Sequence, residues 1–226
     1  MRLSMLADEL HGRLGRAVTV HAGPPAQADP EVRRVVYDSR RSGPGSLFCC
    51  VPGQQLDGHA FAGDAVARGA VALLVEHHLD LDVAQVVVSD ARRAMADAAA
   101  AFWGDPSTHL AVLGVTGTNG KTTVTHLLGA VLSGAGWPCP EPGTLSGSRT
   151  TPEAPDLQEA LAAALASGAR AIAIEVSSHA LALDRVAGTH VEVAVFTNLG
   201  RDHLDFHGTG GAVANPATMS RSSTPS

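Results

Sequence analysis

The strongest constraint in this sequence is a glycine-rich segment, GVTGTNGKTT at residues 114–123, that lies between two patterned regions. The continuous apolar run at 110–115 has the length of a strand, and the pattern at 121–136 is helical. A strand that leads through such a loop into a helix offers backbone N–H donors, close approach and the helix dipole to a chain of phosphates. The segment therefore predicts a phosphate-binding loop in an α/β fold.

Two side chains at the start of the helix support this prediction. Lys121 is the only lysine in the chain and can reach the outer phosphates, and the hydroxyl of Thr122 can ligate Mg²⁺. The spacing departs from the strict G-x4-G-K-[ST] motif, because five residues separate Gly114 from Gly120. A glycine-rich turn without a ligand is the alternative. The succession of strand, loop, Lys-Thr-Thr and helix favours phosphate binding.

Strand patterns alternate with helical patterns along most of the chain, which predicts a parallel, doubly wound α/β sheet. Only 4% of the residues are aromatic, so we expect a core of Ala, Val and Leu. The predicted strands are 46–51, 71–76, 84–89, 110–115, 169–176 and 191–198. The predicted helices begin at the N-terminus and continue with 60–70, 91–104, 121–136 and 156–169.

The turn residues of GDPSTH at 104–109 indicate a linker between two domains, which we place at residues 1–107 and 108–209. The last stretch, 210–226, has little apolar content and a run of Ser, Thr and Pro. We expect it to be a disordered tail.

Composition excludes several classes of partner. The net charge is −6 and no basic stripe is present, which argues against nucleic acid. No apolar run is long enough to cross a membrane, so we expect no membrane insertion and a cytoplasmic protein. The three cysteines have no metal-ligand spacing and are expected to be reduced thiols. The oligomeric state is not predicted.

Acidic and histidine side chains near strand ends are further candidates. Glu175 ends a buried strand, and the carboxyl ends of parallel strands border the crevice where such sheets bind ligands. A carboxylate satisfied by the protein itself is the alternative. His203 and His207 lie in an acidic loop, where solvated histidines are as common as ligands.

Several segments resemble the Mur ligases. The loop GTNGKTT resembles the nucleotide loop of this family and of the related folylpolyglutamate synthetases, and the resemblance extends over roughly residues 30–209. It implies a small α/β UDP-binding domain followed by an incomplete P-loop-type parallel-sheet ATPase domain. The segments that carry it are YDSRRSGPGSLFCCVPGQQLDGHAF (37–61), GTLSGSRTTPEAPDLQ (143–158), EVSSHALALDRV (175–186) and VFTNLGRDHLDFHGT (195–209).

The resemblance implies roles for individual residues. The uridine diphosphate moiety would be held by Tyr37, Ser39, Gln54, Gln55 and Leu56. The muramoyl peptide would be held by Thr150, Thr151, Ser177 and Arg185. ATP would be held by Gly117, Thr118, Asn119, Gly120, Lys121, Thr122 and Thr123. The Mg²⁺ ligands would be Thr122, Glu175 and His203, and the catalytic residues Lys121, Glu175 and His203.

The implied reaction is amide-bond formation in the synthesis of peptidoglycan precursors. A substrate carboxylate attacks the γ-phosphate of ATP, and an amino acid then captures the acyl phosphate. Segment 175–186 favours the family member that adds the third residue, diaminopimelate or lysine, to UDP-N-acetylmuramoyl-L-alanyl-D-glutamate. The substrates would be this UDP-muramoyl dipeptide, an amino acid and ATP.

The chain departs from the family after His207. Family members continue into a helix with a carbamylated lysine and then into a C-terminal domain, whereas residues 210–226 contain no lysine and no helical pattern. We therefore expect a frameshift or premature stop there and no ligase turnover by this chain alone.

Three alternatives remain open from the sequence. One is a non-catalytic module that binds the UDP-muramoyl peptide. Another is a relative of the folylpolyglutamate synthetases, against which the segment at 37–61 argues, because that class begins directly with its nucleotide domain. The third is the family member that adds D-Ala-D-Ala, which shares the first domain but not the pattern at 175–186.

Overall fold

A computed structural model of the chain describes residues 1–15, 18–25, 28–140 and 150–199. The chain divides into two compact units, Met1–Phe102 and Trp103–Ser226, each of which has its own sheet. The division falls next to the 104–109 segment that we expected to act as a linker. Among the described residues, no helix is long and apolar enough to span a membrane.

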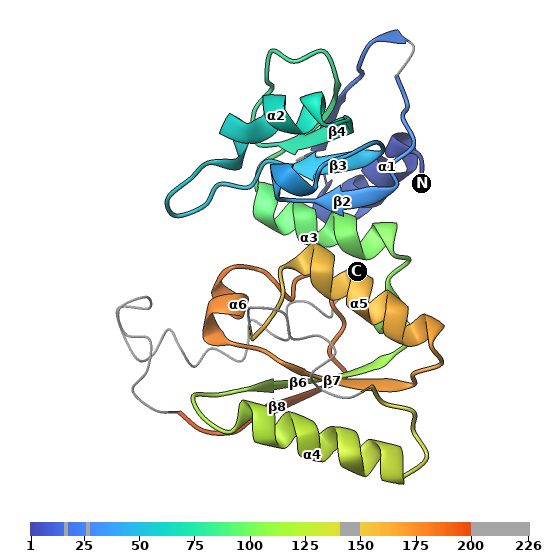
Figure 1. Cartoon of the computed structure of the whole chain (residues 1–226), viewed down its shortest axis with the longest axis vertical. Helices are drawn as coiled ribbons and strands as arrows, with labels where there is room; N and C mark the ends of the chain where they lie inside the picture. Colours follow the sequence, from blue (N-terminus) through green and yellow to red (C-terminus); the bar gives the residue numbers. More distant parts are fainter. Residues whose placement is uncertain (16–17, 26–27, 141–149, 200–226) are drawn as a thin grey trace. The chain divides into compact units, whose positions relative to one another are not determined.

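Unit 1 is built on a five-stranded sheet with the order β1-β5-β4-β3-β2. Figure 1 labels its strands β2, β3 and β4. The strands pair in parallel except β1, which runs antiparallel to β5. The strands are β1 (Val18–His21), β2 (Arg34–Val36), β3 (Ser46–Cys49), β4 (Ala70–Val75) and β5 (Ala84–Val88). The helices are α1 (Leu3–Leu14), η3 (Ser39–Arg41), η4 (Gly58–Phe61), α2 (Ala62–Ala67) and α3 (Ala91–Phe102).

The period-2 alternation of the central strands produces a core on each face of this sheet. Leu47 and Leu74 point to the face that α1 and α3 cover, where Leu6 and the alanines of α3 complete one cluster. Phe48 and Leu73 point to the opposite face, which α2 covers. Because α3 presents mainly alanine to the sheet, most of the helix packs closely, and Phe102 at its end packs partly buried against the same cluster.

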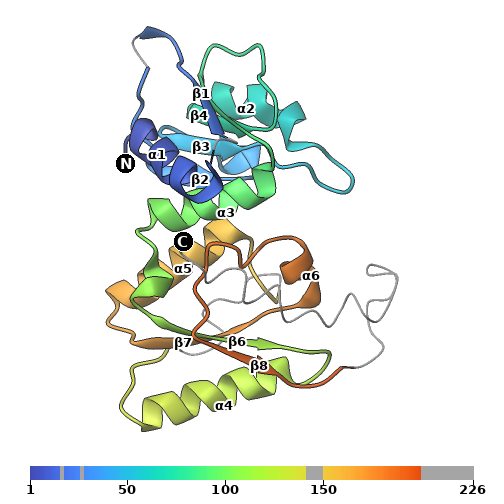
Figure 2. The ribbon, with the colours of Figure 1, turned by 180° about the vertical axis from the view of Figure 1, so that it is seen from behind.

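Unit 2 has three parallel strands among its described residues, in the order β7-β6-β8. The helix α4 covers one face, and α5 and α6 cover the other, as Figure 1 and the reverse view in Figure 2 show. The strands are β6 (Ala111–Thr116), β7 (Ala171–Glu175) and β8 (Val193–Phe196). The helices are η5 (Pro106–Thr108), α4 (Lys121–Gly134), α5 (Ala154–Ala166) and α6 (Ser178–Ala182).

The alternation along β6 and β7 again separates two clusters. Val112 and Ile172 pack against Leu157 of α5, whereas Leu113 and Ala173 pack on the side of α4. The strand β8 forms one edge of the sheet among the described residues, and its Val193 and Phe196 are 46% and 52% exposed. The expected parallel α/β architecture and all six predicted strands are confirmed, whereas β1, β2 and α6 were not predicted.

Replacing Phe48 tests the core on the α2 side of unit 1. Phe48 is 1% exposed, so Phe48→Ala removes buried apolar surface and leaves a cavity. We expect the free energy of unfolding to fall by about 3–5 kcal/mol. Denaturant unfolding of the full chain, followed by circular dichroism, measures this change.

A matched control is Val20→Ala on β1, where the side chain is 42% exposed and the expected loss is below about 0.5 kcal/mol. Equal losses for the two variants would contradict the assignment of Phe48 to the core.

Candidate nucleotide and substrate site

The glycine-rich loop joins the carboxyl end of β6 to the first turn of α4, as its sequence predicts. Gly117 and Gly120 both have positive φ, +133° and +83°, and Gly120 forms the N-cap of α4. The ammonium group of Lys121 bends back over this loop, with Nζ 2.7 Å from the carbonyl oxygen of Gly117 and 3.1 Å from that of Thr118. The positive charge and the first N–H groups of the helix therefore lie at the same loop.

The end of β8 holds this loop in place through two residues that the sequence analysis did not single out. The side chain of Asn198 forms two bonds with the backbone of Asn119, accepting from its N–H and donating to its carbonyl oxygen, each at 3.0 Å. The hydroxyl of Thr197 lies 2.7 Å from the same carbonyl oxygen. The backbone N–H of Thr118 donates to the carbonyl oxygen of Asn198 at 3.0 Å.

Gly117 is required by this arrangement. A Cβ at this position would collide with Oγ1 of Thr197 and would lie 2.9 Å from the carbonyl oxygen of Asn198. The only signal in the sequence for this contact was a polar Thr-Asn pair at the end of an apolar strand. Such a pair indicates the carboxyl edge of a sheet but not the loop that it contacts.

Glu175 is the last residue of β7, and its register partner on β6 is Val115. It therefore lies at the same edge of the sheet from which the glycine-rich loop begins. The side chain is half-buried, and its carboxylate makes no hydrogen bond or ion pair with any described residue. Thr122 is exposed in the first turn of α4. A hydroxyl and an unpaired carboxylate fit the oxygen preference of Mg²⁺.

Thr151 connects Glu175 to the next predicted substrate residue. Its hydroxyl donates to the backbone carbonyl oxygen of Glu175 at 2.9 Å and accepts from the N–H of Ser177 at 3.1 Å. The hydroxyl of Ser177 caps α6 by accepting from the N–H of Ala180 at 3.1 Å. Thr151 is 1% exposed, whereas Thr150 beside it is exposed.

Arg185 completes this cluster. Its Nη1 donates to the carbonyl oxygen of Thr151 at 3.3 Å, and its Nε lies 3.0 Å from a carboxylate oxygen of Glu153. Asp184, directly before it, adopts a left-handed conformation with φ +50°. The structure thus brings Thr151, Ser177 and Arg185 together at the end of β7. Glu153 is an additional member that the sequence analysis missed, since nothing in its local pattern indicates its partner.

The predicted uridine residues lie in unit 1, after the carboxyl ends of the neighbouring parallel strands β2 and β3. Tyr37 follows β2 and is half-buried, and Ser39 begins η3. Gln54, Gln55 and Leu56 occupy a loop closed by a bridge between Pro52 and Asp57. Because β2 and β3 are parallel, the two groups emerge at the same edge of the sheet.

Two titratable groups near the predicted uridine residues have shifted pKa values, the carboxyl of Asp38 and the thiol of Cys50. Hydrogen bonds from the Arg40 guanidinium hold the pKa of the Asp38 carboxyl below its usual range. Burial, together with the charge of Asp57, raises the pKa of the Cys50 thiol to about 12. Cys49, Cys50 and Cys139 take part in no disulfide in the structure. A thiol with so high a pKa is a poor nucleophile at neutral pH.

Three predictions fall partly or wholly outside the described residues. His203, the predicted third Mg²⁺ ligand, and the expected tail at 210–226 belong to the undescribed stretch from 200 to 226. The predicted muramoyl-peptide loop is described only from Thr150 onward. In the described part of the chain, no group of three or more His, Cys, Asp or Glu side chains is arranged to hold a metal ion.

Comparison with known families identifies the type of protein. The model of the Mur ligase middle domain matches residues 115–217, and the model described as the Mur ligase family catalytic domain matches residues 31–103. The chain belongs to the Mur ligase family. Together the two matches cover the glycine-rich loop, the ends of β7 and β8, and the predicted uridine residues.

Two curated Mur ligases with similar sequences share one enzyme name. UDP-N-acetylmuramoyl-L-alanyl-D-glutamate--2,6-diaminopimelate ligase from Geobacillus thermodenitrificans is 46% identical over 218 residues, which cover 92% of this chain. The ligase of the same name from Solibacter usitatus is 47% identical over 195 residues, or 81% of this chain. The chain spans 43% and 40% of the lengths of these two relatives.

Solved Mur ligase structures have the same fold. A structure of a UDP-N-acetylmuramoyl-L-alanyl-D-glutamate--2,6-diaminopimelate ligase aligns with a TM-score of 0.70 and 33% identity over 81% of this chain and 39% of its own. The MurF ligase from Thermotoga maritima, solved in complex with ADP, aligns with a TM-score of 0.60 and 26% identity over 85% of this chain and 44% of its own.

Two glycine substitutions test how the loop is held. Gly117→Ala forces a Cβ against Thr197 and Asn198, whereas a Cβ at Gly120 would meet no atom within 4 Å. We expect Gly120→Ala to cost only the strain of positive φ, about 1–2 kcal/mol, and Gly117→Ala to cost more. Only Gly117→Ala should shift the amide NMR signal of Asn119 together with that of Asn198. A smaller loss of stability in Gly117→Ala than in Gly120→Ala would contradict the contact between the loop and the residues after β8.

Proposed function

We propose that this chain forms the nucleotide-binding and UDP-muramoyl-peptide-binding part of an ATP-dependent ligase that adds the third amino acid to UDP-N-acetylmuramoyl-L-alanyl-D-glutamate. The observation that carries the proposal is the convergence of three groups at the carboxyl edge of the β7-β6-β8 sheet. These groups are the loop with Lys121, the carboxylate of Glu175, and the cluster of Ser177 and Arg185. The names of the most similar curated relatives support diaminopimelate as the incoming amino acid.

The phosphates of ATP are bound by the loop. Gly117 to Thr123 present backbone N–H groups and the N-terminus of α4 to the phosphate oxygens. The ammonium of Lys121 leaves the carbonyl oxygens of Gly117 and Thr118 and moves to the outer phosphates, where it offsets negative charge. The two hydrogen bonds from the side chain of Asn198 keep the backbone of the loop in place while Lys121 changes its partners.

The substrate carboxylate is positioned by the cluster around Thr151. Ser177 and Arg185 donate to the muramoyl peptide, and Glu153 orients the guanidinium of Arg185. The substrate's terminal carboxylate oxygen attacks the γ-phosphorus of ATP and ADP leaves, which forms an acyl phosphate. The amine of the amino acid then attacks the acyl carbon, and inorganic phosphate departs. The residues act by holding the reactants in line rather than by covalent chemistry.

Thr122 and Glu175 would hold Mg²⁺, with His203 as the third protein ligand. These residues would place the ion beside the phosphates of ATP, where it would offset negative charge on their oxygens. The unpaired state of the Glu175 carboxylate among the described residues supports this assignment. We also propose the cytoplasm as the location, because ATP is supplied there.

Removal of the single lysine tests the nucleotide site. We expect Lys121→Met to weaken binding of a non-hydrolysable ATP analogue by about 10- to 100-fold, because a charge-assisted contact with phosphate is lost. Calorimetric titration of the full chain with the magnesium complex of the analogue measures this change.

The control is Arg170→Met, which removes a cation that stacks on Trp137, near the opposite end of β7. Its affinity should match that of the original chain. Equal affinities for Lys121→Met and the original chain would rule out the proposed phosphate site. ATP-dependent phosphate release by the chain would rule out the alternative of a binding module without chemistry.

Replacing the strand-end carboxylate tests the metal site. We expect Glu175→Gln to raise the Mg²⁺ concentration needed for half-maximal binding of the analogue by about tenfold, because one anionic ligand is lost. Binding without metal should change little. The control Glu159→Gln, an exposed position on α5, should leave the Mg²⁺ dependence unchanged. An unchanged Mg²⁺ requirement in Glu175→Gln would remove this residue from the metal site.

A further inference from the structure

Unit 1 contains a buried histidine that none of the roles above uses. His59 lies in η4, directly after the loop that carries Gln54, Gln55 and Leu56, which we call the 53–56 loop. Its side chain is only 7% exposed, and its ring stacks on that of His77 with the centroids 4.5 Å apart. A histidine this well buried, beside an exposed loop, requires partners for both ring nitrogens.

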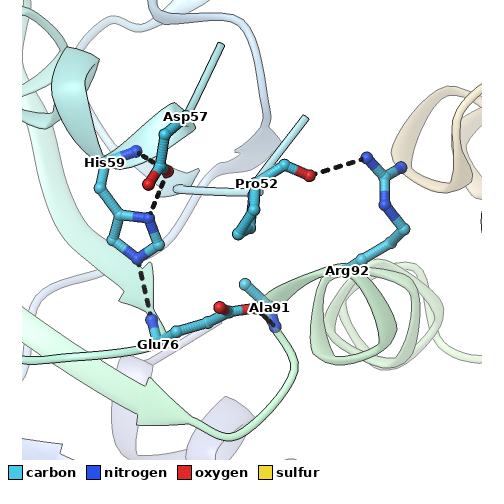
Figure 3. A network of polar contacts seen from close by, with 6 residues as sticks. All are labelled: Pro52, Asp57, His59, Glu76, Ala91 and Arg92. Carbon is cyan, nitrogen blue, oxygen red and sulfur yellow. Dashed lines mark hydrogen bonds and ion pairs between the residues drawn. The ribbon is translucent and has the colours of Figure 1, made fainter. Parts of the chain in front are cut away.

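Both ring nitrogens of His59 have a partner (Figure 3). Nε2 accepts a hydrogen bond from the backbone N–H of Glu76 at 3.0 Å. The proton of the neutral ring is therefore on Nδ1, which donates to the carboxylate of Asp57 at 2.6 Å. The same carboxylate oxygen also accepts from the backbone N–H of His59 at 2.9 Å and caps η4.

This chain of contacts ends at the first turn of α3. The carboxylate of Glu76 accepts from the backbone N–H of Ala91, the first residue of α3, at 2.9 Å. The next residue, Arg92, donates from its guanidinium to the carbonyl oxygen of Pro52 at 3.3 Å (Figure 3). Pro52 and Asp57 are the two residues that close the 53–56 loop. Both ends of the loop are thus tied to the same turn of one helix.

The remaining contacts of the loop are made by its backbone. At its base, the N–H of Gly58 donates to the carbonyl oxygen of Val51 at 3.1 Å, beside the bridge between Pro52 and Asp57. Within it, the N–H of Gly53 donates to the carbonyl oxygen of Leu56 at 2.9 Å, while the Leu56 side chain is 68% exposed. Gln54 and Gln55 are also exposed. Ordering exposed side chains on binding costs conformational entropy, and a loop already held at both ends loses less.

We propose that His59 is a positioning residue for the uridine diphosphate moiety, which it serves by fixing the 53–56 loop against the start of α3. Arg92 has the same role at the other end of the loop. The inference rests on the proposed function, because it takes Gln54 to Leu56 as the uridine contacts. His59 itself does not touch the ligand.

The experiment measures the dissociation constant of uridine diphosphate for the full chain by calorimetry, with the ATP analogue as a second ligand. His59→Phe keeps an aromatic ring for the stack on His77 but loses both hydrogen bonds. We expect it to weaken uridine diphosphate binding by about tenfold. Its affinity for the ATP analogue should not change, and amide exchange at Gly53 should accelerate.

Two further variants keep the test decisive if His59→Phe does not fold. His59→Gln retains an acceptor that can reach the N–H of Glu76, and it should recover at least part of the lost affinity. Arg92→Met changes a half-buried side chain at the other end of the loop and should weaken uridine diphosphate binding by about threefold. The matched control is His21→Phe on β1, whose ring contacts His78 and should leave the affinity unchanged.

The outcomes separate this inference from the proposed function. If the original chain binds uridine diphosphate, and His59→Phe and Arg92→Met bind it equally well, the positioning role is wrong and the proposed function stands. If His59→Phe cannot be folded, Arg92→Met decides: unchanged affinity in this variant overturns the role, because His59→Gln is expected to keep most of the affinity in either case. If the original chain binds the ATP analogue but no uridine diphosphate, the uridine site itself is wrong, and the inference fails with it.

Discussion

The parallel pairing of β8 with β6 is the contact on which the candidate nucleotide site depends. It brings Thr197 and Asn198, about 80 residues later in the chain, beside the loop that follows β6. The side chain of Asn198 binds the backbone of Asn119 as a neighbouring strand would, so the loop is held on one side as though the sheet continued. Without this pairing, the glycine-rich loop would lose its main support outside α4, and its N–H groups would have no fixed direction.

The two basic side chains at this sheet edge, Lys121 and Arg185, have different kinds of partner. Lys121 lies over carbonyl oxygens of its own loop, which are partners that it can exchange for phosphate at little cost. Arg185, in contrast, is already paired with Glu153, and both side chains are largely buried. The ion pair with Glu153 offsets the charge of the Arg185 guanidinium, which keeps directed N–H donors. Such donors suit the proposed recognition of a peptide. The carboxylate of Glu175, at the end of β7, has no partner among the described residues.

Unit 1 also places its predicted binding residues in loops that follow parallel strands. The 53–56 loop is held by polar contacts to the first turn of α3. The core beneath consists mainly of Ala, Val and Leu, with Phe48 as its largest fully buried side chain. Apolar packing therefore sets the positions of the strands, and hydrogen bonds from a few polar residues set the conformation of the loops.

The sequence predicted the long, strongly patterned elements well. The strands at 46–51, 71–76 and 110–115 and the helix beginning at Lys121 are confirmed, because a buried parallel strand is a continuous apolar run. The strands β1 and β2 were missed because three or four residues carry too little periodicity to separate them from loops. The five-residue helix α6 was missed for the same reason.

By itself, the sequence determined the α/β class, the glycine-rich loop with its lysine, and the residues that resemble the Mur ligase sites, since these depend on local pattern and residue type. Only the tertiary structure decided which distant residues meet. Asn198 with Asn119, Arg185 with Glu153, and His59 with Glu76 are pairs separated by 79, 32 and 17 positions. Such contacts follow from strand order and register, which pack apolar faces together, and no local signal in a single sequence specifies them.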